Sequence, residues 1–324
     1  MPGNEDRHLV LVVRRTRLDE LVARYNTVAQ AQFYIEHLGA DFADYLAEHR
    51  RYQAAVAEAA AVLRRFGRVQ RLERGLLPSF LFPPGALVPG ALVVVLGQDG
   101  LVANTLKYAG ARPVIGVNPD PARWDGVLLP FGLGDLPRIV PLALAGRRPL
   151  QAVTMARARL QDGQELSAVN DLFIGARSHV SARYEIAAGG QRERQSSSGI
   201  IVSTGLGSTG WFRSLLAGAA RLAGTLAGDG GEGEAGARRQ LLEHGFPWEA
   251  AHLYFTVREP FPSRTTGTSL VFGRIAPGAP LQVVSAMAEG GVIFSDGVEA
   301  DRLAFDAGMT AVVDLAPERG QLVR

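Results

Sequence analysis

The stretch 91–108, ALVVVLGQDGLVANTLKY, most limits what this chain can fold into. Its first part, Ala91–Leu96, is apolar at every position, which predicts a strand buried on both faces of a parallel sheet. The turn Gly97-Gln98-Asp99-Gly100 follows, and helix-compatible residues resume at Leu101. A strand, a glycine turn and a helix in this order direct backbone N–H groups and a helix N-terminus at one point, which favours phosphate.

Asp99 places a carboxylate in the middle of this turn. A carboxylate repels phosphate unless it binds a metal ion or takes a proton from an attacking hydroxyl, so the combination indicates phosphoryl transfer. The alternative is that Asp99 only caps the helix. Both interpretations stay open on this stretch alone.

The composition bounds the function classes. A chain of 324 residues that is 47% hydrophobic can form two domains with cores of their own. No apolar run reaches the roughly 18 residues of a membrane span, and no dense arginine run with aromatics indicates nucleic acid. The absence of cysteine excludes disulfides, thiolate metal sites and a cysteine nucleophile. We expect a cytoplasmic protein that binds neither membranes nor nucleic acid.

Strands and helices alternate in the first third of the chain. Apolar runs at His8–Val13 and Arg112–Val117 predict strands, and Leu18–Arg65 predicts two helices with a break near Gly39–Asp41. This alternation is typical of a parallel α/β domain, which we place at residues 1–135.

Polar residues follow two of these strands at the edge where open α/β sheets bind ligands. Arg14 and Arg15 follow the first strand and would meet phosphates there, unless they form only a solvated basic turn. Asn118 follows a later strand, and right-handed crossovers place it on the same side of the sheet as Asp99. The alternative for Asn118 is a plain Asn-Pro turn.

Short strand-like runs replace the helical pattern in residues 136–302, which predicts a β-sandwich domain. One such run is Pro149–Leu160, and Gly189-Gly190 predicts a hairpin turn. A helix is expected at Trp211–Ala227, followed by a glycine-rich, mobile surface insertion at 228–239.

A second glycine-rich turn lies in this half, in the segment Gly199–Trp211, GIIVSTGLGSTGW. Its glycines let a ligand approach the backbone, and Ser208 and Thr209 can cap the following helix or bond a substrate hydroxyl or phosphate. It matches neither the G-x-S-x-G of serine hydrolases nor a Walker loop. Earlier, Asn170-Asp171 begins a strand, where an amide and a carboxylate side by side can hold a ribose diol. Ordinary capping turns are the alternative in both places.

The order of these motifs resembles the NAD kinases, which have a GGDG turn, an Asn-Glu pair and a TPTGSTAY-like turn. The mitochondrial-type branch is the most similar, and the resemblance covers nearly the whole chain. The motifs that carry it are GQDG (97–100), VIGVNPDP (114–121), AVNDLFIG (168–175), RYEI (183–186), SSGIIVSTGLGSTGW (197–211) and VREP (257–260).

The resemblance implies an N-terminal Rossmann-like domain and a C-terminal all-β sandwich, the NAD kinase/diacylglycerol kinase-like fold, with residues 303–324 returning to the first domain. It also implies an active site between the domains, with Asp99 as general base or metal-orienting group. The nucleotide-binding residues that it implies are Gly97, Gly100, Asn118, Asn170, Asp171, Thr204, Gly207, Ser208, Thr209, Trp211 and Ser214. It gives no set of metal ligands, and Asp296-Gly297 resembles the family's late Asp-Gly.

This chain departs from the pattern at four positions. Gln98 replaces the second glycine of GGDG and Leu101 the threonine after it. The Gln98 side chain would fill part of the space that a phosphate uses, or donate its own amide hydrogen bond to it. Asp171 replaces the usual Glu. Ser198 stands where the common bacterial branch has an acid, as in the mitochondrial-type branch.

The expected activity is ATP-dependent phosphorylation of the adenosine ribose 2′-hydroxyl of NAD(H) with Mg²⁺, by a homo-oligomer that we expect to be a dimer. Two alternatives remain: a nucleotide-binding relative that transfers no phosphate because of Gln98, and a kinase for a sugar hydroxyl. A lipid substrate is disfavoured because no Lys/Arg-rich amphipathic helix with bulky apolar anchors is present.

Overall fold

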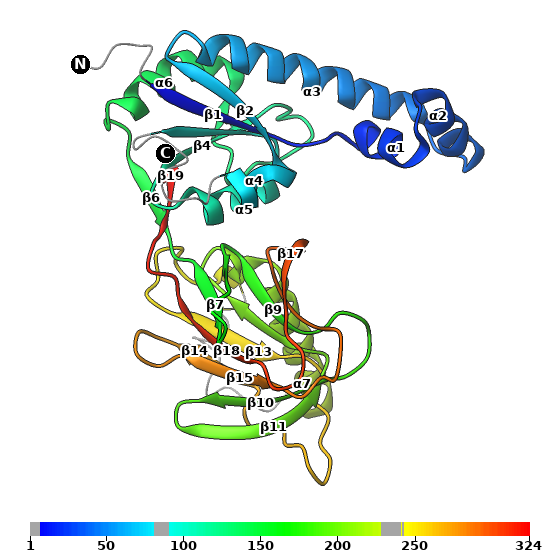
Figure 1. Cartoon of the computed structure of the whole chain (residues 1–324), viewed down its shortest axis with the longest axis vertical. Helices are drawn as coiled ribbons and strands as arrows, with labels where there is room; N and C mark the ends of the chain where they lie inside the picture. The colour runs from blue at the N-terminus through cyan, green and yellow to red at the C-terminus, as the bar shows by residue number, and fades with distance from the viewer. Residues whose placement is uncertain (1–6, 81–90, 228–240, 242) are drawn as a thin grey trace. The chain divides into compact units, whose positions relative to one another are not determined.

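The structure is a computed structural model that describes residues 7–80, 91–227, 241 and 243–324. It divides into two compact units, residues 1–151 with 321–324 and residues 152–320 (Figure 1). The sequence-based boundary was set after residue 135, but helix α6 (Leu136–Leu144) buries its apolar side chains in the core of the first unit. The proposed insertion at 228–239 lies outside the described residues.

The first unit is built on a sheet with the described order β2-β1-β3-β4-β19-β6, in which β5 also pairs with β4. The pairings β1–β2, β1–β3, β3–β4, β4–β5 and β4–β19 are parallel. The strands are β1 (His8–Val13), β2 (Arg68–Glu73), β3 (Leu92–Leu96), β4 (Pro113–Asn118), β5 (Phe131–Gly132), β6 (Leu150–Val153) and β19 (Gly320–Val323).

Helices cover both faces of this sheet. Leu9, Leu11 and Val13 of β1 share a core with α3 and α6, whereas α5 lies on the other face (Figure 1). Helices α1 and α2 extend past the end of the sheet and pack on α3 around a small core of their own. The remaining helices are α1 (Arg17–Tyr25), α2 (Val28–His37), α3 (Phe42–Leu63), α4 (Leu77–Phe80) and α5 (Asp99–Ala109), with short 3₁₀ turns at Arg74–Leu76 and Leu133–Asp135.

Three helices, and not the predicted two, occupy the segment Leu18–Arg65. The predicted break precedes α3, where Asp41 caps the helix. A second break comes at Asn26, whose φ of 67° ends α1, and Thr27 then caps α2 by accepting the N–H of Gln30. Asn tolerates the left-handed region better than most residues, so a helix can end there without glycine.

The second unit is an antiparallel β-sandwich. Its two sheets have the described orders β11-β10-β15-β18-β7-β8 and β14-β13-β12-β9-β16-β17. Side chains from both sheets form one core, including Ala158 and Tyr184 from the first and Ile174, Val202 and Phe255 from the second. The strands are β7 (Ala156–Leu160), β8 (Glu165–Ala168), β9 (Asp171–Ala176), β10 (Ala182–Ala188), β11 (Gln191–Ser197), β12 (Ile200–Ser203), β13 (Leu253–Val257), β14 (Phe272–Ile275), β15 (Leu281–Ser285), β16 (Gly291–Ser295), β17 (Val298–Ala304) and β18 (Thr310–Leu315).

The predicted fold class is confirmed: a parallel α/β unit and an all-β sandwich are both present. Gly189 and Gly190, both with positive φ, form the predicted hairpin turn between β10 and β11, and α7 (Trp211–Ala227) is the predicted helix. The single strand expected at Pro149–Leu160 is two strands in different sheets, β6 and β7. Of the last residues, β18 belongs to the sandwich and β19 joins the first sheet. Within the described ranges, no helix has the length and apolar character needed to cross a bilayer.

Candidate functional site

The Gly97–Gly100 turn joins β3 to α5 at the carboxyl edge of the first sheet. Gly97 is buried and donates its N–H to the carbonyl of Val117 at 3.2 Å. Gln98 is the N-cap residue of α5 but makes no capping bond with its side chain, and Asp99 is the first helical residue. The half-buried Asp99 is therefore at a helix N-terminus, where a negative group is stabilised.

The Asp99 carboxylate is held by the loop that follows β4. Its Oδ1 accepts the N–H of Leu128 at 2.7 Å and its Oδ2 the N–H of Val127 at 3.2 Å. These bonds go to a different segment and not to α5, so they fix the carboxylate at the sheet edge and do not cap its own helix. The remaining acceptor capacity of the two oxygens is what a substrate hydroxyl would use.

Asn118 shapes the same loop. Its side chain is buried, with Nδ2 donating to the carbonyl of Trp124 at 2.9 Å and Oδ1 accepting the N–H of Asp120 at 3.0 Å. Gly126, at a φ of 67°, passes so close that a Cβ there would meet Asn118 Nδ2 at 2.9 Å. Asn118 thus organises the loop that holds Asp99, and these two bonds use one N–H and one acceptor lone pair of its amide.

A cleft of about 360 Å³ adjoins the turn and is rich in arginine. Arg14 pairs with Glu48 at 2.9 Å and Arg17 with Asp44 at 2.6 Å, while Arg123 also contacts Asp44. The lining residues are Arg14, Arg17, Asp44, Glu48, Gln98, Arg123 and Trp124.

This cleft has more positive than negative charge, because three guanidinium groups meet two carboxylates. Burial alone would raise the pKa of Glu48, but hydrogen bonds from Arg17 and Arg14 outweigh it and lower that pKa, so Glu48 is ionised at neutral pH. The Arg14 Nε atom is buried without a hydrogen-bond partner among the described residues. Arg15, the other basic residue at this strand end, is exposed and pairs with Glu73 at 3.0 Å.

The Asn170–Asp171 pair lies where three strands of the sandwich end together. Asp171 is opposite Ser203 in the β9–β12 pairing, and the Asp296 N–H bonds the Asp171 carbonyl at 2.9 Å. The Asp296 carboxylate accepts the backbone N–H groups of Val169, Asn170 and Asp171 at 2.6–3.3 Å. Asp296 has a φ of 54° and Gly297 one of 69°, as the tight turn between β16 and β17 requires.

Asp171 has an unusual carboxyl group. Burial, together with the negative charge of Asp296, raises its pKa from 3.8 to about 7, and a hydrogen bond with Ser203 opposes the shift. Its Oδ1 atom is buried and has no hydrogen-bond partner among the described residues. A carboxyl group that is part protonated at neutral pH can accept from one hydroxyl of a sugar or donate to another.

The Thr204–Thr209 turn supports this pair from behind. The Thr204 hydroxyl donates to the Val169 carbonyl at 2.5 Å and accepts the Gly207 N–H at 3.2 Å. A Cβ on Gly207 would meet the Asn170 carbonyl oxygen at 2.3 Å. Ser208 is buried, and its hydroxyl donates to Gly205 and accepts the N–H of Phe246. Thr204 and Gly207 therefore position the Asn170 segment, whereas Ser208 joins this turn to Phe246.

Three predicted residues lie on the exposed side of this turn. Thr209 and Ser214 are exposed, and the Ser214 hydroxyl bonds the Trp211 carbonyl within the helix. The Trp211 ring stacks on Phe173 at 6.0 Å, and the Arg258 guanidinium lies over it at 5.3 Å. Trp211 remains 36% exposed, so one part of the ring is open to a planar ligand group.

Sequence reasoning did not place Asp296, Arg17 and Arg123 among the site residues. The sequence does carry a signal for Asp296, because an Asp-Gly between two apolar runs predicts a turn. Its hydrogen bonds to the Asn170 segment could not be predicted, because they depend on the pairing of strands more than a hundred residues apart. Arg123 reaches Asp44, which lies 79 positions earlier in the chain. Among the described residues there is no group of three or more His, Asp and Glu side chains that could hold a metal ion.

Solved structures resemble the chain over almost its whole length. The NAD kinase from Archaeoglobus fulgidus in complex with ATP matches with a TM-score of 0.55 and 14% identity, over 98% of this chain and 93% of that one. The yeast NADH kinase complexed with NADH matches with a TM-score of 0.53 and 14% identity, over 98% of this chain and 83% of that one. No protein-family model and no curated protein matches the sequence. The chain therefore has the two-part fold of the NAD kinases, an α/β unit followed by an all-β sandwich.

Proposed function

We propose that the chain is an NAD kinase-like phosphotransferase, which moves the γ-phosphoryl group of ATP to the adenosine ribose 2′-hydroxyl of NAD(H). The observation that carries the proposal is the structural likeness to kinases solved with ATP and with NADH, over 98% of this chain. The motif order GQDG, Asn-Asp and TGLGST supports it independently.

The first unit would receive the phosphate donor. The N-terminus of α5 and the guanidinium groups of Arg14, Arg17 and Arg123 give the turn and its cleft a positive potential. Stabilisation of charge that spreads over the phosphoryl oxygens is the main demand of this reaction. Gln98 lines the same cleft, so its amide is available to hydrogen-bond a phosphate oxygen where family members have glycine.

The second unit would hold the acceptor. Asn170 and Asp171 would grip the ribose hydroxyls, and Trp211 would pack on a ring of the dinucleotide. Asp99, fixed by Leu128 and Val127, would orient or deprotonate the attacking hydroxyl. The proposal requires Asp99 and the Asn170–Asp171 pair to act on one bound substrate.

Mg²⁺ fits the residues present as an ion that enters with the nucleotide. Mg²⁺ is usually held by one or two carboxylates, substrate phosphates and water, so it needs no dedicated protein cage. When bound, it would neutralise charge on the transferring phosphoryl group. Asp99 lies in the donor turn itself and would be the carboxylate of this chain that contacts the ion.

A turnover screen tests the function directly. The full chain would be incubated with NAD, NADH or several sugars, each with ATP or polyphosphate, and the products identified by mass spectrometry. We expect NADP or NADPH with the phosphate on the 2′-oxygen. A phosphorylated sugar with no NADP would redirect the proposal to another hydroxyl.

A second candidate, a nucleotide-binding protein without transfer, is favoured by one observation: Gln98 occupies the donor cleft. The Gln98→Gly variant separates the two. Activity that appears only in this variant would support the binding protein, whereas robust turnover by the natural sequence would reject it.

A further inference from the structure

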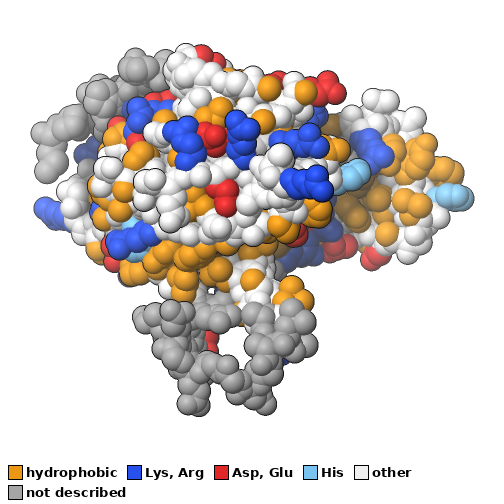
Figure 2. Space-filling model, turned by 90° about the horizontal axis from the view of Figure 1, so that it is seen from below, with side chains coloured by type: hydrophobic (Ala, Val, Ile, Leu, Met, Phe, Trp, Pro, Cys, Tyr) orange, Lys and Arg blue, Asp and Glu red, His pale blue; other side chains and the backbone are white. Residues whose placement is uncertain are grey.

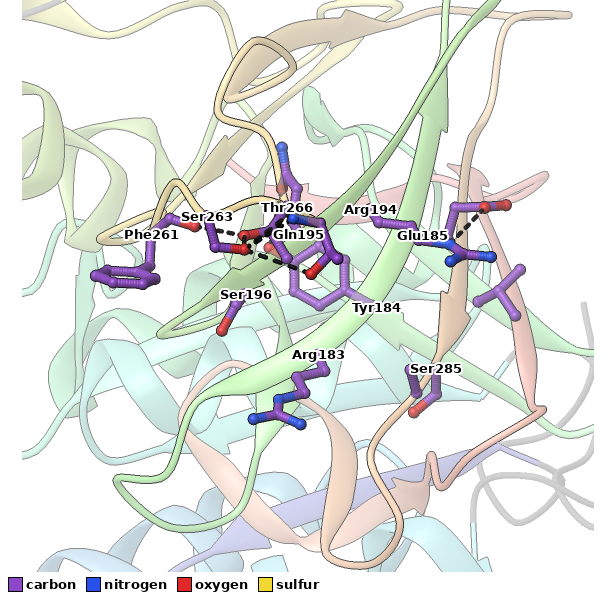
Figure 3. A pocket seen from close by; sticks show the side chains of 13 residues that line it. Arg183, Tyr184, Glu185, Arg194, Gln195, Ser196, Phe261, Ser263, Thr266 and Ser285 are labelled. Atoms are coloured by element: carbon purple, nitrogen blue, oxygen red, sulfur yellow. Dashed lines mark hydrogen bonds and ion pairs between the residues drawn. The ribbon is translucent and has the colours of Figure 1, made fainter.

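A second pocket, of about 730 Å³, lies in the sandwich unit (Figure 3). The strand register places it away from the Asn170–Asp171 pair. Phe261 follows β13, whose Val257 is opposite Ile200 at the start of β12, whereas Asp171 is opposite Ser203 at the end of β12. At about 3.3 Å per residue, these two ends of β12 are roughly 10 Å apart. The pocket is therefore separate from the proposed acceptor site.

The loop of residues 261–267, which forms one wall of the pocket, is fixed against β11 by hydrogen bonds. Phe261 donates its N–H to the Ser196 carbonyl at 2.8 Å, and Gly267 donates to the Arg194 carbonyl at 3.0 Å. Within the loop, the Ser263 hydroxyl accepts two backbone N–H groups, and Thr266 donates its hydroxyl to the Phe261 carbonyl. The loop is thus preformed, a property that lowers the entropic cost of binding.

This rigid loop presents an aromatic ring. The Phe261 side chain is 64% exposed although its backbone is fixed. Val284 and Ala286 add apolar surface to the pocket. Ligand pockets typically combine apolar walls with a few polar groups in a volume of about 300–1,000 Å³, and this one does so.

The charged groups of the pocket are two guanidinium groups, from Arg183 and Arg194, and one carboxylate, from Glu185. The Arg183 guanidinium has no ion-pair or hydrogen-bond partner among the described residues, and Figure 3 shows it on the same side of the strands as Ser196. Arg194 has a long contact of 3.9 Å to Glu185, and that carboxylate pairs more closely with Arg192 at 2.7 Å. An unpaired guanidinium beside hydroxyl groups is a donor set for a phosphate.

We propose that this pocket binds a nucleoside phosphate, with the base against the Phe261 ring and the phosphate on Arg183. The ring accounts for the base, since planar groups stack on exposed aromatic side chains. Free phosphate alone would leave most of the pocket volume and its apolar wall unused. The inference concerns a site distinct from the one proposed for phosphoryl transfer and does not depend on that activity.

Calorimetric titration of the full chain with AMP tests the proposal. The variants Arg183→Gln and Phe261→Ala are each expected to weaken AMP binding about tenfold or more. Arg192→Gln is the matched control, because Arg192 is on the same hairpin but does not line the pocket. It should bind AMP as the natural sequence does.

Several results would overturn the proposal. One is the absence of saturable AMP binding. Another is binding that is lost in Asp171→Asn but unchanged in Arg183→Gln and Phe261→Ala, because AMP would then occupy the acceptor site. Inorganic phosphate that binds as tightly as AMP, with no effect of Phe261→Ala, would reduce the pocket to a simple anion site.

Discussion

The Oδ1 atom of Asp296 accepts the backbone N–H of Asn170 at 2.6 Å, although the two residues are 126 positions apart in the chain. The same carboxylate also accepts the N–H groups of Val169 and Asp171. Because one carboxylate accepts hydrogen bonds from three successive N–H groups, it fixes the backbone of residues 169–171, which carries the proposed ribose-binding side chains. Asp296 is therefore a positioning residue for the pair.

Removal of this carboxylate should loosen the sandwich unit. Asp296→Ala is expected to lower the free energy of unfolding by about 2–3 kcal/mol, because buried N–H groups lose a charged acceptor. Asp296→Asn should cost less, since Asn retains one acceptor oxygen and tolerates the positive φ. Urea unfolding of both variants measures this. If both variants are as stable as the natural sequence, the turn between β16 and β17 keeps its conformation without the Asp296 carboxylate.

Stability should depend on pH through Asp171. Its pKa is about 7 in the folded chain against 3.8 ordinarily, so the folded state binds the extra proton. The stability that this proton contributes is fully present below about pH 4 and is lost as the pH rises through 7. The free energy of unfolding falls by at most about 4 kcal/mol over this range. Asp171→Asn should remove that part of the slope. Unfolding free energies of both proteins from pH 4 to 8 test it, and parallel curves would contradict the assignment.

Tyr52 of α3 connects the ends of β1 and β3 at the edge of the first sheet where the Gly97–Gly100 turn lies. Its hydroxyl accepts the Arg14 N–H at 3.0 Å and donates to the Leu96 carbonyl at 2.8 Å. Tyr52→Phe should cost about 1–3 kcal/mol, because the partners at both strand ends lose a bond. Tyr34→Phe, at a half-exposed site, is the control and should change the melting temperature little. Equal melting temperatures for both variants would mean that water replaces the hydroxyl.

The close approach at Gly207 makes a specific steric prediction. Gly207→Ala would push a methyl group to 2.3 Å from the Asn170 carbonyl oxygen, so the turn must shift. We expect a loss of about 1–3 kcal/mol. Gly218→Ala is the control, since a Cβ there meets nothing within 4 Å and alanine favours a helix. If Gly207→Ala has the same melting temperature as the natural sequence, the turn shifts to make room for the methyl group without a loss of stability.

The sequence predicted the elements whose signals are local. The apolar run of β3 with its glycine turn, and the helix α7 after a second glycine turn, were found because each carries its own periodicity and breaks. The polar strand β11, QRERQSS, was missed, since its pairing with β10 and not its composition makes it a strand. The separation of β6 from β7 was missed because Thr154-Met155 contains no glycine or proline.

The positions of the candidate site residues could be predicted from the sequence, but the hydrogen bonds that their side chains make could not. The hydroxyls of Thr204 and Ser208 are engaged by Val169, Gly205 and Phe246, contacts that no local pattern reveals. The arginine cleft depends on α3 side chains reaching the strand ends. The mitochondrial-type branch, the dimer and the cytoplasmic location stay predictions from the sequence.

NADP formation by Asp99→Asn tests the central claim most directly. Asp125→Asn is the matched control, because Asp125 is an exposed acid in the loop that holds Asp99. The account predicts that Asp99→Asn lowers kcat about a hundred- to ten-thousandfold with little change in melting temperature, while Asp125→Asn keeps its turnover. Unchanged turnover in a folded Asp99→Asn protein would remove Asp99 from the reaction and contradict the account.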